Sequence, residues 1–200
     1  MKDKYLTINK ESKGVYKDKG SKFIAIASHV SSKEDVKEQL AKLRKDYHDA
    51  RHHCYAYNIG VEKEEYRVND DGEPSGSAGR PIHNQLLSYD LTNILVVVVR
   101  YFGGTKLGIP GLIKAYKNAT IDALENNNII TAYKMDKIEI IYPYECMNDV
   151  MKIFKAENIE QLKNTFELDC SIIFEIRHSK TTDITNKLEK IDKLKLKIIP

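Results

Sequence analysis

The residues best suited to chemistry lie between Asp70 and Pro81, in the segment DDGEPSGSAGRP. It holds three carboxylates, three glycines, two serines and one arginine. Because glycine and proline disrupt helix and strand interiors, this segment is predicted to be a loop. Small residues from Ser75 to Arg80 lead into a helix predicted to begin at Pro81. Amides at such a helix start bind anions, and Arg80 adds a planar donor fork.

Three interpretations of this loop are open: a solvated surface loop, a contact for an anion or nucleic acid, and a metal site. A Walker A loop is excluded because Gly79 precedes Arg80 and not lysine. An EF-hand is excluded because Asp70, Asp71 and Glu73 are too bunched for its alternating ligands. We expect these carboxylates to order the loop through hydrogen bonds to the backbone or to Arg and His side chains. The half from Ser75 to Arg80 would then be left for a ligand.

The segment RYFGGTKLGIPG, Arg100–Gly111, is the second candidate. It follows the apolar run NILVVVVRY, which predicts a buried strand, and precedes a helix. Ligand sites often lie in such strand-to-helix loops. Its glycines allow close backbone approach, Arg100 and Lys106 supply charge, and Tyr101 and Phe102 can stack on bases. A tight loop that only reverses the chain is the alternative.

The cluster RHHC, Arg51–Cys54, brings two histidines and a thiol together. Adjacent residues on a strand point to opposite faces, so His52 and His53 are not expected to share one metal. One ring is expected to be packed and the other solvated. Either histidine, with Asp70 or Asp71, is a candidate for acid–base chemistry, because the pKa of histidine is normally near neutrality.

The composition indicates a globular protein with a true core. Of 200 residues, 42% are hydrophobic and 30% are charged, and the net charge is only +3. Polyanion binding would therefore need a local patch. The start, MKDKYLTINK, lacks a signal-peptide core, and Ile94–Val99 is too short to span a bilayer. The three cysteines form no CxxC pair, so we expect no disulfides, and a reducing cytoplasm is the expected compartment. We also expect no cofactor, no metal and no membrane contact.

Apolar periodicity and turn residues predict a chain of helices and strands in two domains, 1–130 and 131–200. The first is predicted to contain a strand at Lys22–Val30, a helix capped by Ser31 or Ser32 with Glu34 or Asp35, a strand at His53–Ile59, a polar loop at Gly60–Arg80, a short helix from Pro81, a strand at Asn93–Tyr101, a loop at Phe102–Gly111 and a helix at Leu112–Asn126. The second is predicted to contain strands at Thr131–Tyr142, Ile159–Leu168, Cys170–His178 and Leu194–Ile199, with helices at Glu145–Asn158 and Lys180–Asp192. Its order, βαββαβ, is typical of the ferredoxin-like fold.

Taken together, RHHC, DDGEPSGSAGRP, VVVVRYFGGTKLG and GLIKAY resemble the IMPACT family, whose bacterial members are YigZ-type proteins. The match covers Ser21–Asn126 with motifs, and the last third fits the ferredoxin-like domain of bacterial members. The resemblance implies that the fold class is α+β, with an α+β first domain like the second domain of small-subunit ribosomal protein five. Elongation factor G has the same pair of domains in succession. One departure is Pro110, which stands where family members more often have glycine and which removes a backbone donor.

The family's eukaryotic members are linked to translational control, whereas its bacterial members have no settled activity. We therefore expect a non-enzymatic protein that binds RNA or the ribosome and modulates translation, with protein partners and an enzyme acting on phosphate compounds as alternatives. The expected anion or nucleic-acid ligands are Ser75, Gly76, Ser77, Gly79, Arg80, Arg100, Tyr101, Gly103, Gly104 and Lys106. The family motifs carry over six of these residues, Gly76, Gly79, Arg100, Tyr101, Gly103 and Gly104. They also carry over His52, His53, Asp70, Asp71, Glu73, Pro74, Pro81, Gly108 and Gly111. The sequence does not set the oligomeric state.

Overall fold

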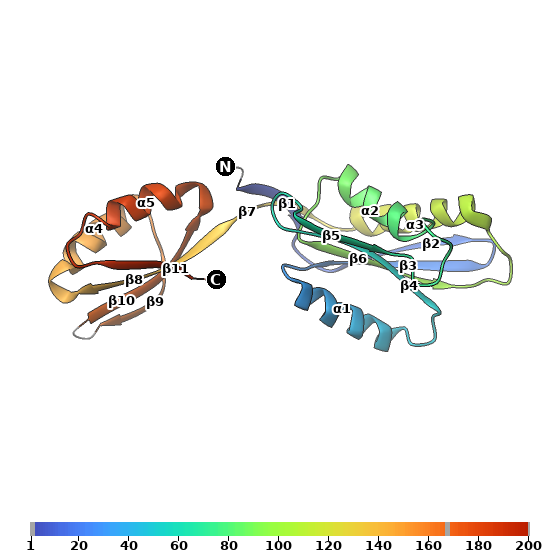
Figure 1. The fold of residues 1–200 in the computed structure, drawn as a ribbon. Coiled ribbons are helices and arrows are strands. Elements are labelled where there is room, and N and C mark those ends of the chain that lie inside the picture. The colour runs from blue at the N-terminus through green and yellow to red at the C-terminus, as the bar shows by residue number, and fades with distance from the viewer. Residues whose placement is uncertain (1–2, 167–168, 200) are drawn as a thin grey trace. The chain divides into compact units, whose positions relative to one another are not determined.

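A computed structural model describes residues 3–166 and 169–199 of the chain, and it is built from both helices and strands, as predicted. Residues Tyr5–Ala132 form one compact unit, called the larger unit below (Figure 1). The described residues on either side of that range form the smaller unit. No helix among the described residues is long and apolar enough to cross a membrane.

The larger unit is a five-stranded sheet with helices on both faces (Figure 1). Its elements are β2 (Ser12–Asp18), β3 (Ser21–His29), α1 (Lys33–Asp46), β4 (His52–Ile59), β5 (Glu65–Asn69), α2 (Gly79–Ser88), β6 (Ile94–Tyr101) and α3 (Gly108–Glu125). The strand order is β2-β3-β6-β4-β5, with every neighbouring pair antiparallel. Near the ends of this unit, β1 (Lys4–Ile8) pairs with β7 (Ile129–Tyr133).

Strand β6 lies at the centre of the sheet and is buried on both faces, as its run of valines predicts. Val96 and Val98 pack in the core under α2 and α3. Val97 and Val99 pack in the second core, under α1. Because the apolar side chains alternate between two helical layers, β6 holds the unit together and fixes where its last residues emerge.

Helix α1 begins with the predicted capping box. Ser32 accepts a hydrogen bond from the Asp35 amide at 3.1 Å, and the Asp35 carboxylate accepts from the Ser32 amide, also at 3.1 Å. The carboxylate also accepts from Ser31, and these hydrogen bonds lower the pKa of Asp35. Val36 and Leu43 of this helix are buried against the sheet.

The structure differs from the predicted elements in several places. Strands β1 and β2 were not predicted, and the predicted strand Thr131–Tyr142 is divided between β7 and a strand at Met135–Pro143. Strand β5 occupies part of the predicted polar loop Gly60–Arg80, because pairing with β4 orders an edge strand whose residues are mostly exposed and carry little apolar signal. Helix α2 starts at Gly79, two residues before the predicted start. Helix α3 starts at Gly108, inside the predicted loop, and it places Pro110 in its first turn, which proline tolerates.

The smaller unit has the predicted βαββαβ order. Its elements are β8 (Met135–Pro143), η1 (Tyr144–Cys146), α4 (Met147–Glu157), β9 (Gln161–Phe166), β10 (Asp169–Arg177), η2 (His178–Lys180), α5 (Thr181–Leu188) and β11 (Lys195–Ile199). The sheet order is β11-β8-β10-β9, so the first and third strands lie side by side at its centre. The end of the predicted strand Ile159–Leu168 lies outside the described residues.

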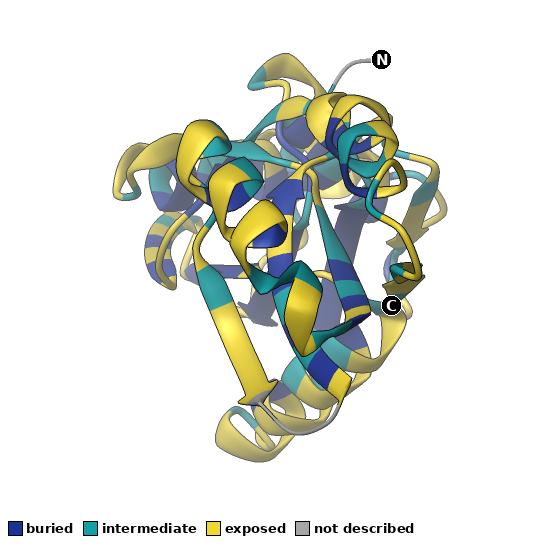
Figure 2. Ribbon diagram, turned by 90° about the vertical axis from the view of Figure 1, so that its left-hand side faces the viewer, coloured by how far each residue is buried: buried dark blue, intermediate teal, exposed yellow. Residues whose placement is uncertain are grey.

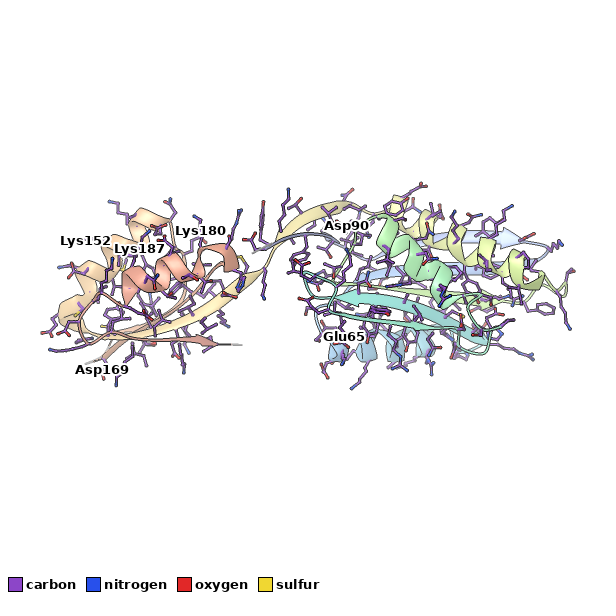
Figure 3. The ribbon with its side chains drawn as sticks, turned by 45° about the horizontal axis from the view of Figure 1, so that its top comes forward. Glu65, Asp90, Lys152, Asp169, Lys180 and Lys187 are labelled. Carbon is purple, nitrogen blue, oxygen red and sulfur yellow. The ribbon has the colours of Figure 1, made fainter. Side chains whose placement is uncertain are left out.

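One face of this four-stranded sheet packs against α4 and α5. Ile140, Ile172 and Phe174 form its core together with Phe154 of α4 and Ile184 of α5. Figure 2 shows the exposed residues of the helices in yellow, on their outer turns. The outer side of the helices carries ion pairs, among them Lys187 (Figure 3), which bonds to Asp183 and Glu157 at 2.6 and 2.7 Å.

Candidate functional site

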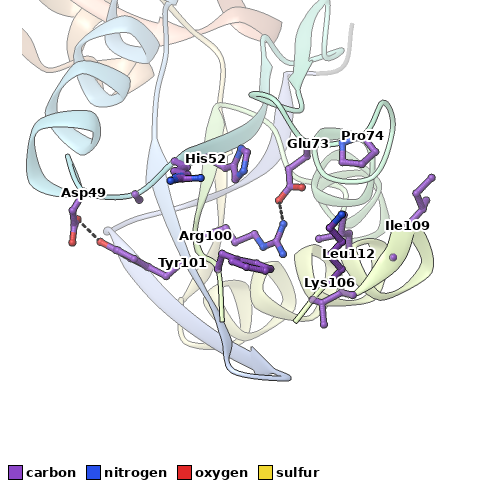
Figure 4. Close-up of a pocket in the computed structure, with 14 residues that line it drawn as sticks. Asp49, His52, Glu73, Pro74, Arg100, Tyr101, Lys106, Ile109 and Leu112 are labelled. Carbon is purple, nitrogen blue, oxygen red and sulfur yellow. Dashed lines mark hydrogen bonds and ion pairs between the residues drawn. The ribbon is translucent and has the colours of Figure 1, made fainter. Parts of the chain in front are cut away.

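The larger unit contains a cavity of about 720 Å³ at the carboxyl end of β6 (Figure 4). Three stretches of chain line it: the connection from α1 to β4, part of the first glycine-rich segment, and the connection from β6 into α3. The lining residues are Asp49, Ala50, Arg51, His52, Glu73, Pro74, Arg100, Tyr101, Phe102, Lys106, Leu107, Gly108, Ile109 and Leu112. The two glycine-rich segments therefore meet at one cavity.

The register of the sheet places Arg100 in this cavity. Arg100 on β6 lies opposite Phe23 on β3 and His52 on β4, so the three side chains share the face covered by α2 and α3. The next pair, Val99 and His53, points to the other face, towards α1. This confirms the prediction that the two histidines face opposite sides of the sheet.

Arg100 forms a buried ion pair with Glu73. Its Nη1 donates to Glu73 Oε1 at 2.7 Å, and the two side chains are only 8% and 4% exposed (Figure 4). Tyr116 of α3 donates its hydroxyl to the same oxygen, at 2.7 Å. The guanidinium carbon lies 5.5 and 5.6 Å from the ring centres of Phe23 and Phe102. Arg100 Nε has no hydrogen-bond partner among the described residues.

Two neutral side chains support this pair from within the core. The Cys54 thiol lies 3.3 Å from the Tyr116 hydroxyl and 3.0 Å from the Asp70 carbonyl oxygen. Burial strongly raises the pKa of both Cys54 and Tyr116. Cys54 is therefore held as a thiol and not as a reactive thiolate, and Tyr116 remains a hydroxyl donor to Glu73.

Asp70 occupies the start of α2. One carboxylate oxygen accepts from the Gly76 amide at 2.8 Å, and the other accepts from Ala78 and Gly79 at 3.0 and 2.8 Å. The expectation that this carboxylate orders the loop is confirmed. Three amides of the half that was expected to be left for a ligand therefore already have an acceptor within the chain.

Asp71 orders the same loop from the side of β4. Its carboxylate accepts from the His53 amide at 2.7 Å and from Arg44 at 3.2 Å, while its carbonyl oxygen lies 2.8 Å from His52 Nδ1. The His53 ring is buried, and this burial lowers its pKa. Asp71 is thus tied to backbone and Arg, as expected. Among the described residues, no three potential ligands gather to hold a metal ion.

The rim of the cavity carries both charge and an aromatic ring. Tyr101 donates its hydroxyl to Asp49 at 2.7 Å (Figure 4), which raises the pKa of Tyr101 to about 12 and lowers that of Asp49. Phe102 is 56% exposed. Arg51 and Lys106 are exposed, and neither forms an ion pair with another described residue.

Gly103 and Gly104 set the path of the chain from β6 into α3. A Cβ on Gly103 would lie 1.9 Å from the carbonyl carbon of Gly20, so only glycine fits beside the turn between β2 and β3. Gly104 has a φ of +87°, in the region that glycine adopts readily. Neither glycine lines the cavity, and their role in the described structure is to let the backbone pass.

The first glycine-rich segment contributes only Glu73 and Pro74 to the cavity. Five residues predicted there as ligands lie outside it: Ser75, Gly76, Ser77, Gly79 and Arg80. Arg80 is exposed in the first turn of α2, and the Ser77 hydroxyl donates to the Pro74 carbonyl at 2.6 Å. Arg100, Tyr101 and Lys106 from the second segment do line the cavity.

Sequence reasoning missed Asp49, Arg51 and Tyr116 as site residues. Tyr116 carried a signal, because a tyrosine on the buried face of a helix needs a partner for its hydroxyl. Arg51 is adjacent to the two histidines, but nothing in the sequence marks its side chain as part of the cavity. Asp49 has no signal of its own, since its role depends on the distant Tyr101.

Residues 19–124 match the model of the Impact N-terminal domain, a range that contains every residue lining the cavity. The IMPACT family member YvyE of Bacillus subtilis (strain 168) is 37% identical over 130 residues, which span 65% of this chain and 60% of YvyE. An IMPACT family member of Haemophilus influenzae is 32% identical over 160 residues, 79% of this chain and 78% of the relative. This chain belongs to the IMPACT family, as its motifs predict.

A solved structure has the same fold. The crystal structure of a hypothetical protein matches this chain with a TM-score of 0.75 and 26% sequence identity, and covers 100% of this chain and 99% of its own. The mixed α and β architecture described above therefore also occurs in that solved structure.

Proposed function

We propose that this protein is a non-enzymatic RNA-binding protein that acts on RNA, free or within the ribosome, and so modulates translation. The observation that carries the proposal is that the exposed side chains of Arg51, Lys106 and Phe102 line one cavity. Cationic side chains contact phosphates, and an exposed aromatic ring offers a stacking surface for an unpaired base.

We also propose, as the family resemblance implies, that the larger unit is like the second domain of small-subunit ribosomal protein five and that the smaller unit is ferredoxin-like. The βαββαβ order and the β11-β8-β10-β9 sheet support the second comparison. Fold likeness alone does not establish a function, so the proposal depends on the cavity.

The alternative, an enzyme acting on a phosphate compound, draws less support from the geometry. Asp70 and Asp71 accept hydrogen bonds from backbone amides, and Glu73 accepts from Arg100 and Tyr116. These carboxylates are engaged in holding the loop and the ion pair, so they are poorly placed to exchange protons with a substrate. Of the acid–base candidates, His52 does line the cavity.

The test is co-sedimentation with ribosomes and binding to a single-stranded RNA at low and at physiological salt. Binding should weaken with salt, with a slope of about −0.7 per phosphate contacted. The double variant Arg51→Ala/Lys106→Ala should lose about tenfold in affinity. Its matched control is Lys114→Ala/Lys117→Ala, which removes two exposed cations of α3 outside the cavity.

The proposal fails if the wild-type protein binds no RNA at low salt, or if the control variant loses as much affinity as the cavity variant. A partner captured equally well after nuclease treatment would favour a protein-interaction module. Arg80→Ala is a further comparison, because this cation is predicted from sequence but lies outside the cavity. Its removal should change binding less than that of Lys106.

A further inference from the structure

We infer that the cavity binds a phosphate monoester, such as the terminal phosphate of an RNA end or of a free nucleotide, between the start of α3 and Arg100. The RNA source rests on the function proposed above, whereas the phosphate chemistry rests on the cavity itself.

The first observation is that α3 begins without a cap. Its N-cap residue is Leu107, no side chain accepts from its first amides, and its first turn holds no acidic residue. The first amides of a helix have no acceptor within the helix, and they carry the positive end of its dipole. Leu107, Gly108 and Ile109 line the cavity, and the last two are exposed. Pro110 supplies no amide, so the donors at this start are those of the residues before it.

The second observation is independent of the helix. Arg100 lines the cavity, its side chain is only 8% exposed, and its Nε has no partner among the described residues. Glu73 engages Nη1, which leaves the guanidinium edge formed by Nε and Nη2. That edge offers two parallel donors, the arrangement that matches two oxygens of one phosphate. A buried donor without an acceptor is costly, so a ligand oxygen there would relieve an existing penalty.

The charges of the cavity favour an anion. Three cations, Arg51, Arg100 and Lys106, line the cavity with two carboxylates, Asp49 and Glu73. Both carboxylates already accept hydrogen bonds from within the protein, Asp49 from Tyr101 and Glu73 from Arg100 and Tyr116. The two exposed cations, by contrast, have no ion-pair partner among the described residues.

The shape of the cavity favours a terminal phosphate over an internal one. Its volume, about 720 Å³, is in the range of pockets that enclose a small ligand. Glu73, Arg100 and Leu112 are buried and bound it on the side of the core. An internal phosphodiester at that depth would require the cavity to hold the nucleotides on both sides of it, whereas a chain end brings a nucleotide on one side only.

The experiment is calorimetric titration of the full chain with four ligands: a short RNA with a 5′-phosphate, the same RNA with a 5′-hydroxyl, AMP and adenosine. The phosphorylated RNA should bind at least about tenfold tighter than its 5′-hydroxyl form, and AMP should bind where adenosine does not. Lys106→Ala should reduce this phosphate preference about fivefold, whereas Lys117→Ala should leave it unchanged.

The outcomes separate the two proposals. AMP binding without RNA binding supports the phosphate site and its nucleotide source, and it rejects the RNA function. Equal binding of the two RNAs, with no binding of AMP, overturns the phosphate inference and leaves the RNA function standing. A phosphate preference that Lys106→Ala does not change also overturns the inference, since the anion would then lie elsewhere.

Discussion

Helices α2 and α3 both start at a glycine after a glycine-rich segment, yet the chain supplies an acceptor to only one of them. At α2, Asp70 accepts hydrogen bonds from three amides at and just before the helix start. At α3, no side chain caps the first turn, and that turn lines a cavity with Arg100 and Lys106. The two helix starts are similar in composition, but a side chain accepts hydrogen bonds from the amides at the start of α2 and none does so at the start of α3.

This difference shows that the three carboxylates of the first glycine-rich segment have separate structural roles. At the start of α2 the anion is Asp70 itself, and the other two carboxylates act elsewhere. Asp70 acts on the backbone, Asp71 ties the loop to β4, and Glu73 reaches across to Arg100. The second segment has no acidic residue, so none of its side chains can occupy the start of α3 as Asp70 occupies the start of α2.

The largest expected loss of stability follows from removing Glu73, the carboxylate that pairs with Arg100 in the cavity. Glu73→Ala leaves Arg100 as a buried charge and Tyr116 without its acceptor, so it should lower the free energy of unfolding by about 3–5 kcal/mol. Urea unfolding followed by circular dichroism measures this loss. Added phosphate should stabilise the variant more than the wild type, because an anion near Arg100 replaces the missing carboxylate.

Glu73→Gln is the matched control for charge, because it keeps an oxygen that can accept from Tyr116. It should lose less stability than Glu73→Ala. A cost below about 1 kcal/mol for Glu73→Ala would contradict the buried ion pair as a main support of the cavity.

The second effect tests the other helix start. Asp70→Ala removes the acceptor of three amides and should cost about 2–3 kcal/mol, measured by the same unfolding assay. Asp70→Asn keeps one oxygen and should cost less. Glu38→Ala, which removes an exposed acid on α1, should be close to neutral.

Asp70→Ala should also make α2 resemble α3. With its amides unpaired, the start of α2 becomes able to accept an anion, so sulfate should restore part of the lost stability. If sulfate stabilises the variant no more than the wild type, the likeness between the two helix starts is wrong.

The smallest effect concerns acid. Burial lowers the pKa of His53, so below about pH 6.5 the unfolded chain binds a proton that the folded chain does not. The contribution of His53 to stability should therefore be constant above this pH and fall as the pH drops further, by at most about 1.4 kcal/mol per pH unit. Burial also lowers the pKa of His83, which adds to the fall in the same direction. His53→Phe should make this part of the profile less steep, whereas His29→Gln, at an exposed position, should not. An unchanged slope in His53→Phe would mean that another group controls this acid sensitivity.

Much of the fold could be predicted because its strongest elements carry local signals. The valines of β6, the capping box of α1 and the alternation of the last third are read directly from neighbouring residues. Strand β5 was missed because Tyr66 and Val68 are exposed on an edge strand, where pairing with β4 and not burial orders the chain. The start of α3 was missed because Gly108 and Pro110 indicate a loop unless the helix geometry is known.

Sequence could group the residues of the site only where they lie close together in the chain. Arg100 and Lys106 are close in the chain, and both line the cavity. The role of Asp70 depends on amides six to nine positions later, and that of Asp49 on a strand 52 positions away. Such pairings are set by sheet register, which one sequence does not reveal.

The central claim is that α3, and not α2, presents an anion-binding helix start. The most direct measurement is a ¹⁵N–¹H spectrum of the full wild-type chain titrated with AMP. The account predicts that the amide signals of Gly108 and Ile109 shift with AMP concentration, while those of Gly76 and Gly79 stay in place. Shifts at Gly76 and Gly79, with Gly108 and Ile109 unchanged, would contradict it.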